Sequence, residues 1–160
     1  MRNRQERPAN FGFQISNPFV YGFGMFDISA QAIDPHALRA AMGANAAGGF
    51  VCFEGWVRDL NLERAVQQLA FEADAQLAAN EFAKIEAEAR EKFEVLEICC
   101  VHRTGVLAIG ELAVWIGVTS VHRDPAFGAC RYLIDELKSR LPIWKKEHYG
   151  DGDSGWLNHP

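Results

Sequence analysis

The residues best suited to chemistry in this 160-residue chain are two lysines, Lys138 and Lys145, seven positions apart. Lys138 lies near the end of a predicted helix that is apolar on one side. Lys145 follows the proline that ends this helix, beside Trp144. A lysine in water is an inert cation, whereas a lysine held against apolar walls near other cations can act as an acid, a base or a nucleophile. The pair therefore marks the chain as a candidate enzyme.

The helix that carries Lys138 also supports a simpler interpretation. Its apolar stripe consists of Ala126, Phe127, Cys130, Leu133, Ile134, Leu137 and Leu141. Lys138 falls about 20° beyond Phe127, at the edge of this stripe. Arg131 and Asp135 follow the same edge. The helical pattern alone therefore favours an ordinary Arg131–Asp135 ion pair beside a lysine that reaches to solvent.

Cationic residues where predicted strands end shift the balance toward a functional site. They are, in chain order, Arg58, His102, Arg103, His122 and Arg123. We expect these groups to converge on one edge of the sheet and form a cradle for a phosphate or a carboxylate. The N–H groups that begin the last helix would add to the attraction for an anion. Together with the two lysines, this set predicts an anion site.

Charge is distributed unevenly along the chain, whose formal net charge is −5. Residues 121–148 carry six Lys and Arg against four Asp and Glu, which leaves the rest of the chain at −7. An acidic protein with one basic segment favours a small anionic ligand or an anionic chain end. We expect no nucleic-acid partner, because the net charge would repel a long phosphate backbone.

Composition and spacing exclude several other classes of protein. The chain is 49% hydrophobic, which is enough for one domain with a core. It shows neither an apolar run long enough to cross a bilayer nor a secretory signal, so we expect a cytoplasmic protein with no membrane contact. The histidines and cysteines lack the spacing of metal ligands or disulfides, so we expect buried thiols, no metal and no cofactor. The cysteines are Cys52, Cys99, Cys100 and Cys130.

The order of predicted elements indicates an α/β fold of the α+β type, with two long helices packed on a mixed or antiparallel sheet. Predicted helices cover residues 34–42, 74–93 and 124–141, and predicted strands cover residues 50–57, 66–71, 95–101 and 112–120. Residues 105–110 are predicted to be a turn, and residues 148–160 a loose tail. We divide the chain into a flexible N-terminal extension (1–24), a single domain (25–156) and a terminal tail (157–160).

Several segments resemble a known family. They are FEGWVR at 53–58, HRTG at 102–105, HRDPAF at 122–127, and LK at 137–138 followed by PIWKKE at 142–147. In order and in spacing, from about Met25 to Trp156, the chain resembles the large, catalytic subunit of molybdopterin synthase. The HR-x-x-AF element combined with the two lysines and PIWKKE is highly specific, whereas F-x-G-x-V-R alone would be weak.

The resemblance implies an α/β-hammerhead fold and a homodimer. Each large subunit would bind one small, ubiquitin-like sulfur-carrier subunit, which gives a heterotetramer. The carrier ends in Gly-Gly with a C-terminal thiocarboxylate, which would insert into the large subunit's pocket. Its sulfur would pass to cyclic pyranopterin monophosphate, and two such transfers would create the dithiolene of molybdopterin in molybdenum cofactor biosynthesis.

By the same resemblance, Lys138 and Lys145 are the catalytic lysines. Positions that match the substrate site are Trp56, Val57, Arg58, His122, Arg123, Lys145, Lys146 and Glu147. Further candidate anion contacts are His102, Arg103 and Arg131. We expect Lys138 to act as an acid, a base or a transient covalent group, and Lys145 to orient the thiocarboxylate or neutralise an oxyanion. The sequence leaves the division of roles between the two lysines open.

Other interpretations of the same residues stay open. A non-catalytic module would dock a ubiquitin-like tail or a phosphorylated ligand without turnover, but it would need positive charge rather than this particular pair of lysines. A Schiff-base enzyme would bind a carbonyl substrate covalently on Lys138, and no other residue supports this possibility. Trp144 suits either a core position or a ring that stacks on a flat heterocycle.

Overall fold

The computed structural model describes residues 24–158. This part of the chain contains three helices and nine strands, and the strands form two sheets. The helices are α1 (Pro35–Ala41), α2 (Ala75–Lys92) and α3 (Arg123–Arg140). The strands are β1 (Gly24–Ser29), β2 (Gly49–Trp56), β3 (Leu60–Asn61), β4 (Arg64–Ala73), β5 (Val95–Arg103), β6 (Gly105–Ala108), β7 (Leu112–Ser120), β8 (Ile143–Tyr149) and β9 (Gly152–Asn158). Apart from Gly24, the predicted N-terminal extension lies outside the described residues, as do residues 159–160 of the predicted tail.

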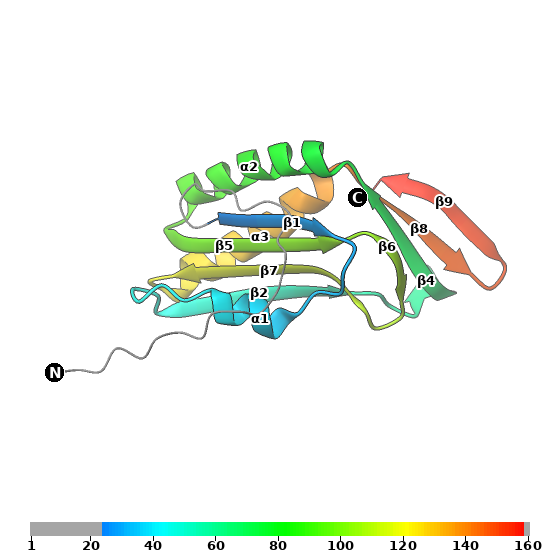
Figure 1. The fold of residues 1–160 in the computed structure, drawn as a ribbon, viewed down its shortest axis with the longest axis horizontal. Helices are drawn as coiled ribbons and strands as arrows, with labels where there is room; N and C mark the ends of the chain where they lie inside the picture. The colour runs from blue at the N-terminus through cyan, green and yellow to red at the C-terminus, as the bar shows by residue number, and fades with distance from the viewer. Residues whose placement is uncertain (1–23, 159–160) are drawn as a thin grey trace.

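The first sheet has four strands in the order β1-β5-β7-β2. β1 runs parallel to β5, whereas β5 and β2 both run antiparallel to β7. The two long helices, α2 and α3, cover one face of this sheet, and α1 lies on the other (Figure 1). The predicted fold class, a mixed sheet with two long helices packed on it, is confirmed.

Most of the core lies between this sheet and the two long helices. Phe82 of α2, Leu133 of α3 and Ile116 of β7 have at most 1% of their surface exposed. Burying a side chain of this size stabilises the fold by about 1.5–3 kcal/mol. A smaller cluster beneath α1 contains Leu38 and Trp115. No helix among the described residues is long and apolar enough to cross a membrane.

The second sheet contains β3, β4, β8 and β9, with β6 also paired to β4, and it lies at one end of the first sheet (Figure 1). Two predictions were wrong here. Residues 105–108 of the predicted turn form β6. In the predicted loose tail, residues 148–149 belong to β8 and residues 152–158 form β9. The three glycines of this segment suggested a loose tail. Instead, Gly152 and Gly155 take positive φ values within β9, a backbone conformation that glycine adopts without steric cost.

The end of α3 sets the direction of the chain that follows. The N–H of Leu141 still donates to the carbonyl of Leu137, over 3.1 Å. Pro142 has no N–H and cannot continue the helix. The prediction that the helix ends at this proline is therefore confirmed. The next residues enter β8, where Ile143 pairs with Ala73 of β4, so PIWKKE continues as a strand of the second sheet.

Candidate active site

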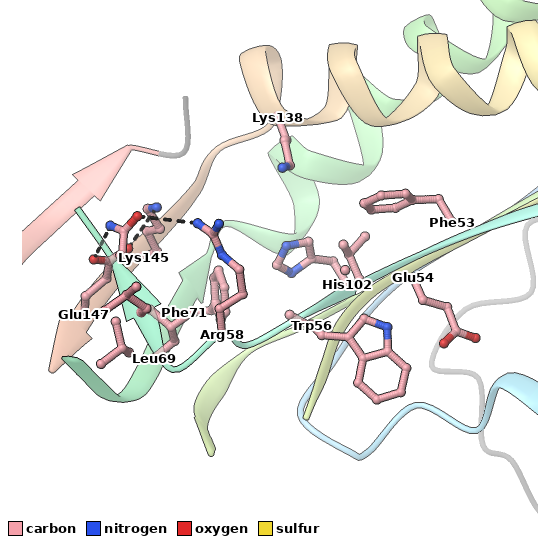
Figure 2. A pocket seen from close by; sticks show the side chains of 16 residues that line it. Phe53, Glu54, Trp56, Arg58, Leu69, Phe71, His102, Lys138, Lys145 and Glu147 are labelled. Atoms are coloured by element: carbon pink, nitrogen blue, oxygen red, sulfur yellow. Dashed lines mark hydrogen bonds and ion pairs between the residues drawn. The ribbon is translucent and has the colours of Figure 1, made fainter. Parts of the chain in front are cut away.

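A cavity of about 500 Å³ opens where the end of α3 faces β2, β4 and β8 (Figure 2). Its polar and charged side chains are Glu54, Arg58, Asn61, His102, Lys138, Lys145 and Glu147. Its apolar side chains are Phe53, Trp56, Leu60, Val66, Leu69, Phe71, Ala113 and Val114. A concave site with an apolar lining and a few polar groups is typical of small-ligand pockets.

The two predicted catalytic lysines reach this cavity from different elements. Lys138 extends from the last turns of α3 and points toward His102 in Figure 2. Lys145 extends from β8 and lies on another part of the wall, beside Glu147. The fold thus brings the pair to one site, although their catalytic role remains a prediction.

Glu147 holds Lys145 in place. The Lys145 Nζ lies 3.1 Å from Glu147 Oε1, and the Glu147 side chain is only 5% exposed. Asn61 Nδ2 donates to Glu147 Oε2 over 2.8 Å, and the Tyr149 hydroxyl donates to the same oxygen. Lys145, Glu147 and Tyr149 alternate along β8, so their side chains share the face that meets the cavity.

The balance of forces on Glu147 favours its ionised form. Burial on its own raises the pKa of the carboxyl. Hydrogen bonds from Tyr149, Asn61 and Lys145 outweigh this effect and lower the pKa below its ordinary value of 4.5. Near neutral pH the wall therefore carries a carboxylate with Lys145 beside it. The substrate contact predicted for Glu147 remains a prediction, but its oxygens are already occupied by these three partners.

The strand exits predicted to bear cations supply two more groups. Arg58 follows β2, and its Nη2 lies 3.4 Å from Asn61 Oδ1. His102, at the end of β5, is buried, and its Nδ1 donates to the carbonyl of Arg103 over 2.8 Å. Its ring meets the ring of Phe71 edge to face. Trp56 is 57% exposed on the wall, so part of its ring is open to a ligand.

The predicted convergence of all the strand exits is wrong for His122 and Arg123. β7 runs antiparallel to β2 and β5, and its end at Ser120 pairs with the starts of those strands. His122 and Arg123 therefore lie at the end of the sheet opposite to Arg58 and His102. Sequence alone could not show this, because it did not reveal which strands run antiparallel. Both residues are exposed, and neither lines the cavity of its own chain.

The other predicted site residues also lie off this wall. Val57 is 2% exposed and belongs to the core. Lys146 is on the opposite face of β8, with its Nζ 3.5 Å from Asp153. The exposed Arg131–Asp135 ion pair, at 3.0 Å, is the ordinary pair that the helical pattern favoured. Arg131 lines a neighbouring groove between β2 and α3.

Arg103 and Trp144 also lie away from the cavity. Arg103 pairs with Glu111 over 2.8 Å and does not line the cavity. Trp144 is on the same face of β8 as Lys146 and is 37% exposed, so it is neither a core residue nor part of the wall. The side-chain alternation of β8 decides the position of Trp144, and the sequence had not indicated a strand there.

Asn61 and Tyr149 contact Glu147 but were not among the predicted site residues. Asn61 lies in a two-residue strand, which is too short to show a hydrophobic period in the sequence. Tyr149 could have been found if PIWKKEHY had been interpreted as a strand, because positions 145, 147 and 149 then share one face. Contacts between Asn61 and Glu147 join parts of the chain 86 residues apart, and these depend on the folded structure.

Other sources of chemistry are weak in the described part of the chain. No group of three His, Cys, Asp or Glu side chains there could hold a metal ion. Burial raises the pKa of Cys99 to about 12 and of Cys130 to about 11, which keeps both thiols protonated. A protonated thiol is a poor nucleophile, so the lysines are the stronger candidates.

Comparison with known proteins gives one consistent result. The family described as MoaE protein matches residues 28–140. A molybdopterin synthase catalytic subunit from Synechococcus elongatus is 46% identical over 111 residues, covering 69% of this chain and 67% of that protein. The protein of the same name from Thermoplasma volcanium is 37% identical over 130 residues, covering 81% and 95% respectively.

Solved structures agree with these relatives. The crystal structure of molybdopterin synthase from Staphylococcus aureus superimposes with a TM-score of 0.78 at 35% identity, over 84% of this chain and 97% of that one. A MoaE protein from Burkholderia ambifaria gives a TM-score of 0.73 at 31% identity, over 86% and 90%. The mixed α/β fold of this chain is thus shared with these solved structures.

The mixed α/β fold and its lysine-lined cavity define an enzyme subunit of one family, and this chain belongs to the MoaE protein family. The chain functions as a catalytic subunit of molybdopterin synthase, like the named members of this family. They are molybdopterin synthase catalytic subunits, sulfurtransferases of molybdenum cofactor biosynthesis.

Proposed function

We propose that this chain transfers sulfur from the C-terminal thiocarboxylate of a small, ubiquitin-like carrier subunit to cyclic pyranopterin monophosphate. Two such transfers form the dithiolene of molybdopterin. The observation that carries the proposal is the position of Lys138 and Lys145 on one cavity wall, although they come from different elements. Arg58 adds a third cation to the same wall.

The cavity has the properties that both reactants require. The acceptor is a flat pterin with a cyclic phosphate, and the donor is an anionic chain end. The cavity's volume of about 500 Å³ suits a ligand of pterin size. The exposed face of Trp56 offers a stacking surface, and Arg58 offers a fork of donors for a phosphate.

The two lysines have different surroundings, which supports different roles. Lys145 is paired with Glu147 and is suited to orient the thiocarboxylate or to neutralise an oxyanion as it develops. Lys138 is half-buried beside Phe53 and His102 on the cavity wall. It is suited to exchange a proton, or to form a transient bond, at the carbon that receives sulfur.

A homodimer reconciles the geometry with the predicted roles of His122 and Arg123. These residues cannot line the cavity of their own chain, because they lie at the opposite end of the first sheet. We propose that they enter the cavity of a second copy and bind phosphate there. With one carrier on each copy, the assembly would be a heterotetramer.

Three of the four cysteines are buried and none is in a disulfide, which is consistent with a reducing compartment. A thiocarboxylate donor likewise needs protection from oxidation. We therefore propose that the reaction takes place in the cytoplasm.

Reconstitution with purified components tests the function. The chain is incubated with cyclic pyranopterin monophosphate and with a carrier that bears either a thiocarboxylate or an ordinary carboxylate. We expect dithiolene only with the thiocarboxylate. Carrier binding without product would instead identify a non-catalytic docking module.

A further inference from the structure

Asn61 occupies an unusual place at the cavity. It is the last residue of β3 and pairs with Arg64 of β4 across a turn formed by Leu62 and Glu63. Both turn residues have positive φ values, 48° and 61°, which residues other than glycine rarely adopt. A local structure that costs free energy persists when the surrounding contacts hold it. Here the turn directs the Asn61 side chain toward Glu147.

The contacts of Glu147 are divided between its two oxygens. Oε2 accepts from Asn61 Nδ2, over 2.8 Å, and from the Tyr149 hydroxyl. Oε1 lies 3.1 Å from Lys145 Nζ. A carboxylate with one oxygen held by two donors cannot rotate freely, so its other oxygen has a defined direction. Figure 2 shows the side chains of Lys145 and Glu147 next to each other on the cavity wall. Arg58 Nη2 lies 3.4 Å from the Oδ1 atom of Asn61.

We propose that Asn61 is a positioning residue, which fixes the Glu147 carboxylate and through it the direction of the Lys145 ammonium in the cavity. This inference rests on the proposed function, since it concerns how Lys145 meets the sulfur donor. It also assigns Glu147 to the support of Lys145 rather than to contact with the substrate. Asn61 itself acts at one remove from the reacting atoms.

The position of the Lys145 ammonium depends on what holds it. Lys145 carries its charge on a flexible four-carbon chain, and an ammonium has no preferred direction of its own. The carboxylate of Glu147, whose side chain is 5% exposed, supplies that direction. Displacing a reacting group by about 1 Å can cost about a hundredfold in rate. Loss of the Asn61 donor would free Glu147 to rotate and would leave one buried oxygen with fewer partners.

The first test is Asn61→Ala in the reconstituted reaction. We expect kcat to fall by roughly ten- to a hundredfold, with little change in KM for the pterin. A residue that simply binds substrate would instead raise KM. Asn61→Leu, which is branched at the same carbon but has neither a donor nor a charge, serves the same test if Asn61→Ala does not fold. The control is Asp151→Asn, which breaks the exposed ion pair with Arg64 on the same sheet.

The pH dependence of kcat distinguishes positioning from a purely structural role. A purely structural role of Asn61 would not shift this pH dependence. The charged and titratable groups that face Glu147 are Lys145 and Tyr149 on β8 and Arg64 on β4. The Asn61 hydrogen bond lowers the pKa of Glu147, so its removal raises that pKa. Activity that needs the carboxylate is lost as the pH falls through this pKa. We therefore expect the acid limb of kcat to move to higher pH in Asn61→Ala and to stay in place in Asp151→Asn.

A double-mutant cycle decides whether Asn61 acts through Glu147. If it does, Asn61→Ala has almost no further effect on kcat in a Glu147→Gln background. Effects that multiply independently would overturn the inference, and so would an Asn61→Ala enzyme with wild-type kcat and pH profile. Either result leaves the proposed function intact. Absence of dithiolene with the wild-type chain would instead reject the proposed function.

Discussion

Lys138 and Lys145 line one cavity from two different elements, α3 and β8, with Pro142 between them. In an unbroken helix, seven residues would place them about 10 Å apart along the same face. The break at Pro142 instead sends the chain into the second sheet. The relative position of the two ammonium groups therefore depends on how α3 packs against that sheet, so the site forms only in the folded domain.

Lys138→Ala should lower the rate of dithiolene formation by at least about a hundredfold, because a positioned acid or base commonly contributes that much. Product formation with the thiocarboxylated carrier is the measurement. Lys84→Ala, on the exposed surface of α2, is a matched control that should keep full activity. Near-normal dithiolene formation by Lys138→Ala would remove this residue from the mechanism.

A mixture of Lys138→Ala and Arg123→Ala chains should recover activity that neither variant has alone. If Arg123 serves the cavity of the second copy, a mixed dimer contains one cavity with both wild-type residues. Random pairing of equal amounts then restores about a quarter of the wild-type rate. Activity is measured after the two proteins are unfolded and refolded together. An inactive mixture would mean that both residues act within one chain.

Glu88→Gln should make the free energy of unfolding less dependent on pH in the acid range. Hydrogen bonds from Arg140, then from Tyr132, lower the pKa of Glu88 to about 2 from its ordinary value of 4.5. A carboxyl group with a lowered folded pKa stabilises the fold above pH 4.5, and this contribution is lost as the pH falls from 4.5 to about 2. Urea unfolding at several pH values gives the slope of the unfolding free energy against pH. Between pH 4.5 and about 2, this slope should correspond to about one fewer proton bound on unfolding in the variant than in the wild type. An unchanged slope would contradict this assignment.

Gly117→Ala should destabilise the first sheet by about 1–3 kcal/mol, since overpacking a core typically costs this much. A Cβ at Gly117 would lie 2.4 Å from the Trp115 ring and 2.7 Å from Met42 Sδ. Gly43→Ala is the control, because a Cβ there meets no atom within 4 Å. Chemical unfolding of both variants is the measurement, and equal stabilities would show that Trp115 can move aside at no cost.

Replacing Leu62 with Asn and Glu63 with Gly should stabilise the domain by about 1–2 kcal/mol, because left-handed backbone is costly for most side chains and natural for Asn-Gly. Leu62 is 85% exposed, so little packing is lost. Leu77→Asn removes another exposed leucine, from α2, where φ is not positive, and should bring no gain. Thermal unfolding separates the two outcomes, and a less stable turn variant would mean that Leu62 has a contact that matters.

Local chemistry explains why much of the fold could be predicted. Residues 74–93 repeat apolar side chains at helical spacing, and the structure buries Ala78, Phe82, Ile85 and Ala89 on α2. Pro142 ends α3 because it lacks an N–H, whatever surrounds it. Such signals involve neighbouring residues only. They failed at β6 and β9, since those short strands form by pairing with β4 and β8 rather than by any pattern of their own.

The sequence by itself determined the chemical inventory of this protein: the two lysines, the cationic strand exits and the family that these residues resemble. The tertiary structure alone decided which of them meet. It placed Arg58 and His102 with the lysines, sent His122 and Arg123 to the far end of the sheet, and brought Asn61 to Glu147. The physical reason is that strand direction and side-chain alternation depend on pairing between distant segments, which no local pattern in the chain contains.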